Sequence, residues 1–387
     1  MPSKKINIIA PYERPWSDVE LIKECILMPY ILYKNYGYDV TVVGKAPEGV
    51  SAGIYSEDNM KKLPDGIYDN YRYISGVKFE LLDSFQEEER INYLKNNYEN
   101  IDVLYLRGVY KLNMKMAPEY KKLKTEGVVI CALDANSSWM DRIYWYLPPY
   151  TEFMNSCDVI TTSCTAMANM LSIKWPWKVH SIINGFFNLS KVHKGRNPFY
   201  KRENIILTVG RLGTRQKATE VLLKAFAKAQ NSIPDWRLCL AGSMEEEFKT
   251  FLEEFLKENK CLSERIICTG VVSDRDELAE LYDRAKIYAL TSEYEGGTNN
   301  ATAEALGRGL IPVTTRIDAY EDITDHGRIG RSFDIGDADS LSRILIELCN
   351  NVDLEKESEK VYAYAKKTYD MEIITGELNG LIERKWK

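Results

Sequence analysis

Short apolar runs alternate along the chain with longer stretches in which apolar residues recur at helical spacing. The runs are rich in Val, Ile and Leu without alternating polar positions, which is typical of parallel strands buried on both faces. Their alternation with helices predicts βαβ units, and Gly37 stands where a helix C-cap glycine is expected. The predicted strands of the first half are Ile6–Ala10, Val40–Val43, Val77–Leu82, Val103–Leu106, Val128–Leu133 and Val159–Thr161. The predicted helices there are Asp18–Tyr36, Glu87–Asn97, Met114–Lys124 and Cys164–Ser172.

The second half repeats this pattern after a polar segment. Ser190–Glu203 contains Lys, Arg, Gly, Asn and Pro residues, and this composition favours a domain boundary there. From Asp337 onward the pattern is helical, in three segments. The predicted strands are Ile205–Val209, Arg237–Ala241, Arg265–Thr269, Ile287–Leu290 and Ile311–Thr314. The predicted helices are Val221–Ala229, Glu245–Glu258, Asp274–Ala285 and Thr302–Arg308.

Composition and charge narrow the class of protein. The chain has 387 residues, of which 45% are hydrophobic and 28% charged, as in ordinary soluble domains. No apolar run approaches the roughly 18 residues that span a bilayer, and Ile6–Ala10 is too short for a secretory signal, so we expect a cytoplasmic protein. Eight cysteines without a C-x-x-C pair and three histidines predict neither disulfides nor a zinc site. The net charge of −6 argues against bulk nucleic-acid binding.

A basic, glycine-containing loop follows the predicted strand Ile205–Val209. Its sequence, GRLGTRQK, places Gly210, Arg211 and Lys217 between a strand and the start of a helix. In open parallel sheets ligands bind at the carboxyl ends of the strands, and helix N-termini and basic side chains bind phosphate groups. The loop is therefore a candidate anion site, although a solvated basic turn has the same pattern.

Two glutamates bracket a stretch of bare backbone after the predicted strand Ile287–Leu290. In SEYEGGTNNATAEALGRG, Gly296 and Gly297 would let a ligand approach the backbone. Ionised carboxylates accept strong hydrogen bonds from hydroxyl groups such as those of sugars. Together with the basic loop, Glu295 and Glu304 predict a site for a sugar, a diphosphate and a ribose in turn. Taken singly, each glutamate could instead cap a turn or lie on a solvated helix face.

The second half resembles the donor domain of retaining GT-B glycosyltransferases of family 4, also called glycosyl transferases group 1. The segments VGRLGTRQKATEVLLKAFA, WRLCLAGS, IICTGVVSDRDELAELYDRAKIYALTSEYEGG and EALGRGLIPVTT follow the family's order, and IINGF is similar to the turn that closes its first domain. The resemblance is specific over roughly residues 180–345 and only architectural before them. It implies an α/β protein of two Rossmann-like, doubly wound domains that face a cleft, at residues 1–190 and 191–365. Residues 366–387 are expected to form a helix that packs back on the first domain.

The resemblance also implies roles for individual residues. Arg211 and Lys217 would stabilise the donor diphosphate as charge builds on the leaving group. Glu295 would hold the donor sugar and Glu304 the ribose. Members of the family generally need no metal, so we expect no cofactor beyond the nucleotide-sugar co-substrate. The positions whose backbone is implied to contact the donor are Gly210, Gly270, Val271, Gly296, Gly297, Thr298 and Asn299.

The spacing of the two glutamates departs from that of the family. Eight residues lie between Glu295 and Glu304, and the family usually has one fewer. Glu293 is an alternative for the first role, although its spacing is worse. We keep Glu295, because an extra glycine can be absorbed as a bulge.

The first half departs further from the family pattern. The family often has a glycine pair after its first strand, where this chain has Pro11–Ser17. It also often has a His after the strand that ends here at Leu133, and no His lies near that position. Asp134 or Asn136 is the candidate to take over the contact to the transferring sugar, and loss of activity is the alternative.

Several polar residues follow the predicted strands of the first half and are expected on the acceptor side. Glu13, Arg107, Asp134 and Asn136 all have such positions. Asp134 could orient or deprotonate an acceptor hydroxyl, or it could cap the next helix near Ser137. A nearby aromatic group would suit stacking on a sugar, but core packing is the expectation for most of its members. These aromatic residues are Trp139, Tyr144, Trp145, Tyr146 and Tyr150.

The segment Tyr110–Lys124 carries five lysines among Met and Leu residues. It could be a basic amphipathic helix that rests on an anionic membrane from the cytoplasmic side, where lipid-linked acceptors are found. The alternative is an ordinary solvated helix face.

These features together predict a retaining glycosyltransferase. It would move a sugar from a nucleoside-diphosphate sugar, with a UDP-sugar favoured, to a glycan, a lipid-linked acceptor or a small molecule. The alternative is a non-catalytic GT-B subunit that binds glycan beside an active glycosyltransferase. A third candidate is a sugar-nucleotide epimerase of the same fold.

Overall fold

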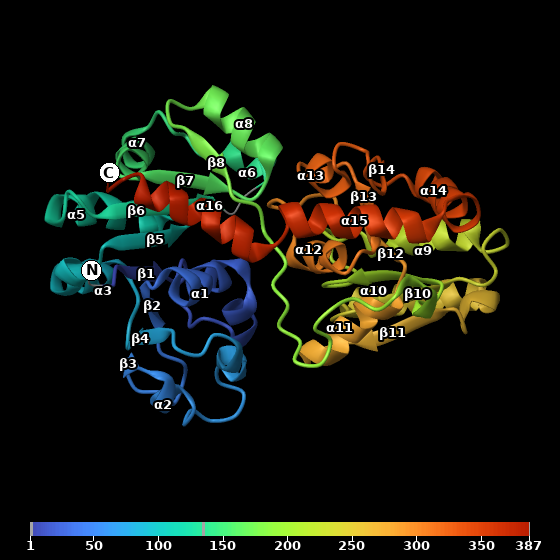
Figure 1. The fold of residues 1–387 in the computed structure, drawn as a ribbon, viewed down its shortest axis with the longest axis horizontal. Coiled ribbons are helices and arrows are strands. Elements are labelled where there is room, and N and C mark those ends of the chain that lie inside the picture. The colour runs from blue at the N-terminus through green and yellow to red at the C-terminus, as the bar shows by residue number, and fades with distance from the viewer. Residues whose placement is uncertain (1–2, 134–135, 387) are drawn as a thin grey trace. The chain divides into compact units, whose positions relative to one another are not determined.

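The structure, a computed structural model, describes residues 3–133 and 136–386. The chain divides into two compact units (Figure 1). Unit 1 comprises Met1–Ile183 together with Met371–Lys387, and unit 2 comprises Asn184–Asp370. Each unit is built around a mainly parallel sheet with helices, as the alternation of apolar runs predicted.

The sheet of unit 1 has the strand order β3-β4-β2-β1-β5-β6-β7-β8. Its strands pair in parallel, except for the antiparallel pair β3–β4. The central strands are almost completely buried, as expected for parallel strands covered on both faces. The strands are β1 Lys5–Ile9, β2 Asp39–Lys45, β3 Gly53–Tyr55, β4 Lys78–Leu82, β5 Val103–Arg107, β6 Val128–Leu133, β7 Val159–Thr162 and β8 Val179–Ser181.

Helices connect these strands, with short 3₁₀ turns at Asp18–Ile22, Asp69–Tyr73 and Tyr98–Asn100. The first long helix ends at Gly37, which has a φ of 71° and is the C-cap that the sequence predicted. The helices are α1 Glu24–Tyr36, α2 Glu57–Met60, α3 Glu87–Asn97, α4 Lys111–Met114, α5 Met116–Leu123, α6 Ser137–Met140, α7 Pro148–Asn155, α8 Thr165–Lys174 and α16 Met371–Glu383.

The helix predicted over Asp18–Tyr36 is wrong in one respect, because it is broken at Lys23, whose backbone is extended. The turn before the break is held by Glu20, which accepts two hydrogen bonds of 2.8 Å from Arg14 and others from the backbone and hydroxyl of Ser17. Burial alone would raise the pKa of Glu20, but these hydrogen bonds lower it to about 2.

The basic segment Tyr110–Lys124 forms α4 and α5 instead of one helix, and its apolar side faces inward. Met116, Ala117 and Tyr120 are buried in unit 1. Four of its lysines form ion pairs with carboxylates, which favours an ordinary surface over an apolar face available to a membrane. These pairs are Lys115–Glu87, Lys121–Asp158, Lys122–Glu119 and Lys124–Asp102. Among the described residues, no helix combines the length and the apolar character needed to cross a bilayer.

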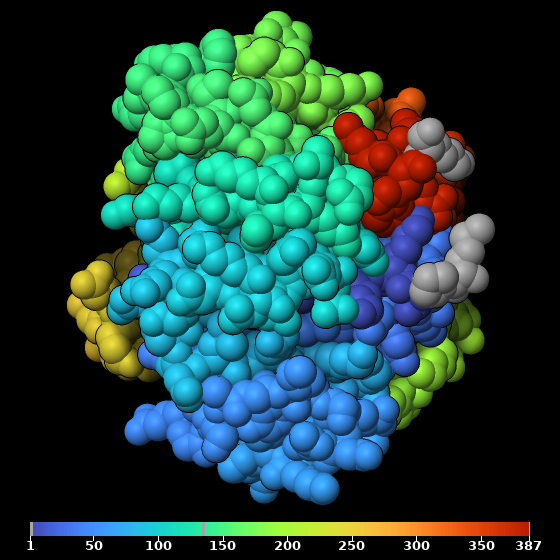
Figure 2. Space-filling model, turned by 90° about the vertical axis from the view of Figure 1, so that its left-hand side faces the viewer, coloured from blue at the N-terminus to red at the C-terminus, as the bar shows by residue number. Residues whose placement is uncertain are grey.

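The last helix, α16, returns to unit 1 and packs against α1. Ile374, Leu378 and Ile382 are buried on it, and Tyr38 donates a 2.9 Å hydrogen bond to Oδ1 of Asn379. Figure 2 shows α16 in red beside the blue N-terminal elements of unit 1. The predicted return of a C-terminal helix to the first domain is confirmed.

The sheet of unit 2 is parallel throughout its described pairs and has the strand order β11-β10-β9-β12-β13-β14. From β9 the chain builds outward to β11 and then crosses to the other side of β9. The order therefore reverses between β9 and β12, and such switch points are where open sheets bind ligands. The strands are β9 Ile205–Val209, β10 Arg237–Ala241, β11 Ile266–Gly270, β12 Ile287–Leu290, β13 Ile311–Thr315 and β14 Arg331–Phe333.

The helices α9 to α13 lie between these strands, α14 and α15 follow the last of them, and 3₁₀ turns occur at Phe199–Lys201 and Lys260–Leu262. The helical pattern predicted from Asp337 onward is confirmed by α14, α15 and α16. The helices are α9 Thr219–Ala229, α10 Glu246–Glu258, α11 Arg275–Arg284, α12 Asn300–Gly307, α13 Tyr320–Thr324, α14 Ala338–Asn351 and α15 Leu354–Thr368.

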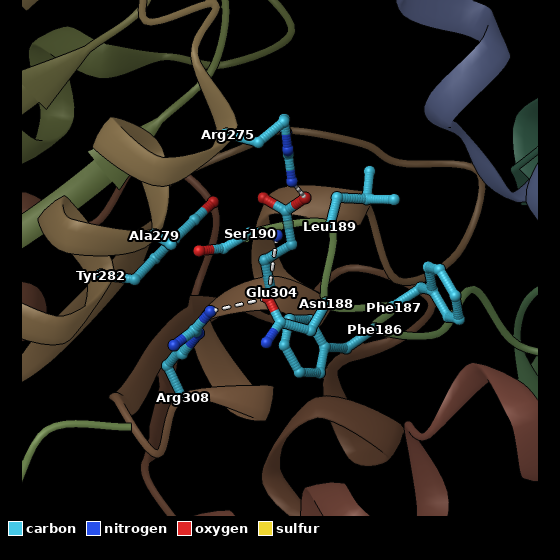
Figure 3. Close-up of a pocket in the computed structure, with 10 residues that line it drawn as sticks. All are labelled: Phe186, Phe187, Asn188, Leu189, Ser190, Arg275, Ala279, Tyr282, Glu304 and Arg308. Atoms are coloured by element: carbon cyan, nitrogen blue, oxygen red, sulfur yellow. Dashed lines mark hydrogen bonds and ion pairs between the residues drawn. The ribbon is translucent and has the colours of Figure 1, made fainter. Parts of the chain in front are cut away.

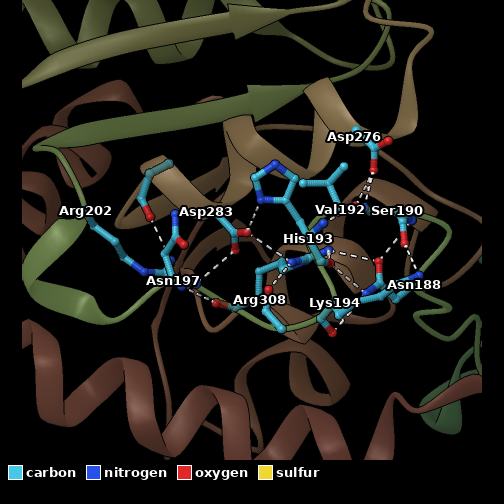
Figure 4. A network of polar contacts seen from close by, with 12 residues as sticks. Asn188, Ser190, Val192, His193, Lys194, Asn197, Arg202, Asp276, Asp283 and Arg308 are labelled. Carbon is cyan, nitrogen blue, oxygen red and sulfur yellow. Dashed lines mark hydrogen bonds and ion pairs between the residues drawn. The ribbon is translucent and has the colours of Figure 1, made fainter.

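The segment that follows unit 1 is fastened to unit 2 by a buried arginine, Arg308 (Figure 4). Its guanidinium donates to the carbonyl oxygens of His193 and Gly195, at 3.0 and 2.6 Å, and to Oδ1 of Asn188 at 2.9 Å. It also pairs with the carboxylate of Asp283 at 3.1 Å. Burial raises the pKa of Asp283, and the charge of Arg308 opposes this effect.

A second side chain, Asp276, holds the same segment. Its Oδ1 accepts hydrogen bonds from the backbone N–H groups of Lys191 and Val192, at 2.7 and 3.0 Å, and from the hydroxyl of Ser190 (Figure 4). The polar segment Ser190–Glu203 is thus an attached part of unit 2, because its backbone groups are bonded to side chains of α11 and to Arg308.

The chain passes between the units twice, after Ile183 and after Asp370. The first passage lies before the division predicted after residue 190, and the second lies beyond the one predicted after residue 365. On the unit 2 side the two passages are joined, because the N–H of Phe186 donates a 2.6 Å hydrogen bond to the carbonyl of Tyr369.

Candidate active site

The loops after β9 and β12 form the candidate site of unit 2. These strands are parallel neighbours in the sheet, so both loops leave it at the same edge. The first loop runs from Gly210 to Ala218 and leads into α9, and the second runs from Thr291 to Asn299 and leads into α12. The switch point of the sheet therefore brings the basic loop and the glutamate loop together.

Lys217 and Glu295 form an ion pair where the two loops meet. Glu295 is only 6% exposed, and its Oε1 also accepts a 2.6 Å hydrogen bond from the hydroxyl of Ser292. The hydroxyl of Thr291 donates to the carbonyl of Lys217 at 2.8 Å and so fixes the backbone of the basic loop. Lys217 and Glu295, which the sequence assigned to the same site without showing a contact between them, are therefore in direct contact.

Gln216 joins the two loops as well, and sequence reasoning missed it. Its Nε2 donates to Oε2 of Glu295 at 3.1 Å and to the carbonyl of Tyr294 at 3.2 Å. Its Oε1 accepts a 2.9 Å hydrogen bond from Arg211. The sequence contains one indication of a role for Gln216, its position between Arg215 and Lys217. This indication is weak, because a neutral amide side chain has no characteristic sequence pattern.

Glu293, the alternative to Glu295, lies elsewhere. It is partly exposed and pairs with the exposed Arg215 at 3.5 Å. The geometry therefore puts Glu295, and not Glu293, beside Lys217. The glycines after Glu295 accommodate the longer spacing, since Gly297 has a φ of 133°, a value that favours glycine.

The start of α12 follows these glycines. Asn299 caps the helix, because its Oδ1 accepts a 2.9 Å hydrogen bond from the N–H of Thr302. Thr298 is buried, its hydroxyl lies 3.1 Å from that of Tyr369, and its carbonyl accepts a 2.8 Å hydrogen bond from Asn184. Their side chains thus hold the turn, and their backbone amides are the groups at the positive end of the helix dipole.

Glu304 lies on α12 and forms an ion pair with Arg275, the first residue of α11. The two side chains face one another in a small hollow (Figure 3). Gly270 and Val271 lie just before α11, at the end of β11, and Val271 is exposed. Arg275 is a second residue that the sequence did not predict, because its partner is 29 positions away.

The predicted acceptor-side residues belong to unit 1, where they follow the neighbouring strands β1, β5 and β6. Glu13 is exposed in the loop after β1. Arg107 ends β5 and forms a 2.9 Å ion pair with Glu24. Oδ1 of Asn136 accepts a 3.0 Å hydrogen bond from the N–H of Trp139 and caps α6. Asp134, predicted as a catalytic or capping residue, lies outside the described residues.

The aromatic group of unit 1 is more exposed than expected. Core packing was predicted for most of its members, and this was wrong for Trp139, Tyr144 and Tyr146, which are 53%, 48% and 63% exposed. They lie in and between the short helices α6 and α7, which bury Met140 and Phe153 instead. Tyr110, Trp139 and Tyr150 help to line a hollow beyond the ends of β5 and β6. The hollow is completed by Gly108, Val109, Leu133, Met140, Arg142 and Ile143.

No group of three or more His, Cys, Asp or Glu side chains in the described ranges is arranged to hold a metal ion. The cationic groups beside the glutamates are Arg211 and Lys217 in the first loop and Arg275 on α11.

Unit 2 matches a known family. Residues 190–368 fit the family described as "Glycosyl transferases group 1". Phosphatidyl-myo-inositol mannosyltransferase of Mycobacterium leprae (strain TN) is 24% identical over 178 residues, which are 46% of this chain and 46% of the relative. The chain thus spans about half the length of that curated relative.

Solved structures resemble the whole chain. A glycosyltransferase from Rickettsia africae ESF-5 has a TM-score of 0.72 at 13% identity, covering 100% of both chains. HepE of Anabaena, solved in complex with UDP, has a TM-score of 0.69 at 14% identity, covering 98% of this chain and 100% of that chain. The chain therefore has the GT-B fold, and its residues 190–368 match the model of the glycosyl transferases group 1 family, in the part of the chain whose motifs resemble that family.

Proposed function

We propose that this chain is a glycosyltransferase that transfers a sugar from a nucleoside-diphosphate sugar to a hydroxyl group. One observation carries the proposal. Lys217 and Glu295 are in contact at the ends of two adjacent parallel strands, beside the start of α12. A cation, a run of helix-start amides and a buried carboxylate match a diphosphate next to a polyol.

The reaction breaks the bond between the anomeric carbon and the diphosphate oxygen. The electron pair of that bond leaves with the nucleoside diphosphate, and the acceptor oxygen forms the new bond while its proton is lost. Arg211 and Lys217 would stabilise the charge that grows on the leaving diphosphate. Glu295 would hold hydroxyls of the transferring sugar, and Glu304 would hold the ribose. Retention of the anomeric configuration is part of the proposal, from the resemblance to the retaining family.

A UDP-sugar is the proposed donor. The similar structure of HepE was solved with UDP, and the same fold throughout both chains supports a comparable nucleotide site here. The proposed acceptor is a glycan, a lipid-linked sugar or a small molecule, bound at the strand ends of unit 1. Asp134, which directly follows β6, is proposed to orient or deprotonate its hydroxyl.

A thermal-shift and hydrolysis screen tests the proposal. Purified protein is measured with UDP-, GDP- and ADP-sugars, because a ligand that binds the folded state raises its stability by mass action. We expect a rise in Tm with at least one UDP-sugar, together with slow release of UDP. No shift and no hydrolysis with any of the sugars would overturn the proposal. A shift without hydrolysis, and without transfer to any acceptor, would instead favour the non-catalytic subunit.

Membrane contact is tested separately, by flotation with vesicles that contain anionic lipid. Because the lysines of α5 are ion-paired and its apolar side is buried, we expect no salt-sensitive association through this helix. Association that is lost when Lys121 and Lys122 are changed to Gln would contradict this expectation.

A further inference from the structure

Gln216 uses both ends of its amide group: Nε2 bonds to the second loop of the candidate site, and Oε1 bonds to Arg211 of its own loop. Nε2 donates to Glu295 at 3.1 Å, and Oε1 accepts from Arg211 at 2.9 Å. The same Nε2 also reaches the carbonyl of Tyr294 at 3.2 Å, and the backbone carbonyl of Gln216 accepts a 2.8 Å hydrogen bond from the N–H of Glu293. Gln216 is thus bonded to the loop Thr291–Asn299, which carries Glu295, through both its side chain and its backbone.

An amide suits this place because of what lies on each side of it. A guanidinium only donates hydrogen bonds and an ionised carboxylate only accepts them, so Arg211 and Glu295 could pair directly with each other. A glutamine between them offers an acceptor to the first and a donor to the second. One amide group thus bonds both to the guanidinium of Arg211 and to the carboxylate of Glu295.

The hydrogen bond from Gln216 to Glu295 matters because a charged partner of Glu295, Lys217, can also bind phosphate. Lys217 and Ser292 both contact Oε1 of Glu295, and in the described part of the chain the hydrogen bond found at Oε2 comes from Gln216. A bound diphosphate would draw the ammonium of Lys217 toward its own oxygens. Glu295 would then keep two neutral donors, one on each oxygen, and would stay ionised and in place.

We propose that Gln216 is a positioning residue, which keeps Glu295 aimed at the donor sugar and Arg211 at the diphosphate while Lys217 moves from the carboxylate to the donor. This inference rests on the proposed function, since it assigns a role within the same donor site. Gln216 itself touches neither the sugar nor the phosphate in this role, because both of its polar atoms are engaged by protein groups.

Two substitutions separate the contacts. Gln216→Met keeps the length of the side chain but removes its three hydrogen bonds, to Arg211, Tyr294 and Glu295. Gln216→Glu keeps an acceptor for Arg211 but replaces the donor to Glu295 by a second carboxylate. Arg215→Met is the matched control, because Arg215 is the adjacent residue, its side chain is 89% exposed and it pairs with Glu293 at the surface.

Steady-state hydrolysis or transfer with the active UDP-sugar is the first measurement. We expect Gln216→Met to lower kcat roughly ten- to a hundredfold, the scale of a lost hydrogen bond to a charged group, with KM changed by no more than about threefold. Gln216→Glu should lower kcat at least as much, and Arg215→Met should match the wild type. Wild-type kcat in both Gln216 variants would overturn the inference.

Hydrogen exchange is the second measurement, and it does not depend on activity. Loss of the Gln216 side-chain hydrogen bonds should speed exchange of the backbone amides of residues 293–299 in Gln216→Met. In the control, Arg215→Met, exchange of these amides should match that of the wild type. If the wild type neither binds nor hydrolyses any nucleotide sugar, the proposed function fails, and this exchange still decides whether Gln216 holds the glutamate loop. Unchanged exchange in residues 293–299 would overturn the positioning role.

Discussion

Each of the two proposed donor glutamates is held by a cation. Glu295 pairs with Lys217, and Glu304 pairs with Arg275. A donor that binds here must therefore share these carboxylates or replace their partners, so part of its binding energy is used for the exchange. Such buried, well-satisfied charges are costly to leave unpaired, which keeps the site ordered before the ligand arrives.

The choice between the two neighbouring glutamates can be tested at this scale. Glu295→Gln keeps the shape of the side chain and removes its charge, so we expect turnover of the donor to fall by roughly tenfold or more. Glu293→Gln should leave turnover within about twofold, because Glu293 pairs with Arg215 at the surface. Steady-state kinetics of both variants, with circular dichroism as a check of folding, would make the comparison. The opposite ranking would mean that the glutamate loop is shifted by two residues.

Metal removal gives a second prediction for the same residues. Arg211 and Lys217 already carry positive charge beside the proposed diphosphate position, and this is the role that a divalent cation has in other phosphate sites. We expect excess EDTA to change the rate by less than about twofold. A loss of activity that Mg²⁺ or Mn²⁺ restores would contradict this prediction.

At the scale of the secondary-structure element, strands with their own apolar run were predictable and short edge strands were not. The bounds of β9, β10 and β12 agree with those predicted from their apolar runs. In contrast, β3, β8 and β14 have three residues each and lie at the edges of their sheets. Pairing with a neighbouring strand determines them, and a local pattern of three residues carries too little information to show it.

The same distinction explains which parts of the site could be predicted. Arg211, Lys217, Glu295 and Glu304 were predicted because each follows a strand or lies on the helix after one, and their roles remain predictions. Their partners could not be found in this way, because side-chain contacts between loops have no local signature. The exposed aromatic residues of unit 1 were assigned to the core because composition alone does not say which face of a short helix is covered.

The 3₁₀ turn before α1 carries a prediction about pH. The pKa of Glu20 falls from 4.5 to about 2 on folding, so its contribution to stability is complete above about pH 4.5 and is lost as the pH falls toward 2. Because Arg14 is half exposed, we discount the contribution to about 1–2 kcal/mol.

The variant Glu20→Gln isolates this effect. Its free energy of unfolding, measured in urea, should lie below that of the wild type near pH 6. The difference should shrink as the pH falls from 4.5 toward 2, because Glu20 of the unfolded chain takes up a proton in this range while Glu20 of the folded protein stays ionised. Glu48→Gln, at an exposed position, is the control and should show no such change. A difference that stays constant with pH would mean that Glu20 acts through its shape and not its charge.

At the scale of the whole molecule, unit 1 depends on a helix that follows unit 2 in the sequence. Leu378 is buried on α16, which packs on α1. Leu378→Ala should therefore destabilise unit 1 by about 2–5 kcal/mol, the usual cost of a buried Leu→Ala change. Hydrogen exchange should speed up in α1 and leave unit 2 unchanged. The control is Ile373→Ala, an exposed position of the same helix, and equal effects in both units would contradict the assignment of α16 to unit 1.

The split composition of unit 1 also sets an order of events during synthesis. Unit 2 is continuous in sequence, so all of it has been made before residue 371 is added. Domains usually fold as units while the chain is being made, the N-terminal one first. Here the part of unit 1 that is made first lacks α16 until unit 2 has been made, so the side of α1 that α16 covers stays open to solvent while unit 2 emerges and can fold. We therefore expect chaperones that recognise apolar surface to bind unit 1 of the nascent chain, and to dissociate from it once α16 has emerged from the ribosome and packs on α1.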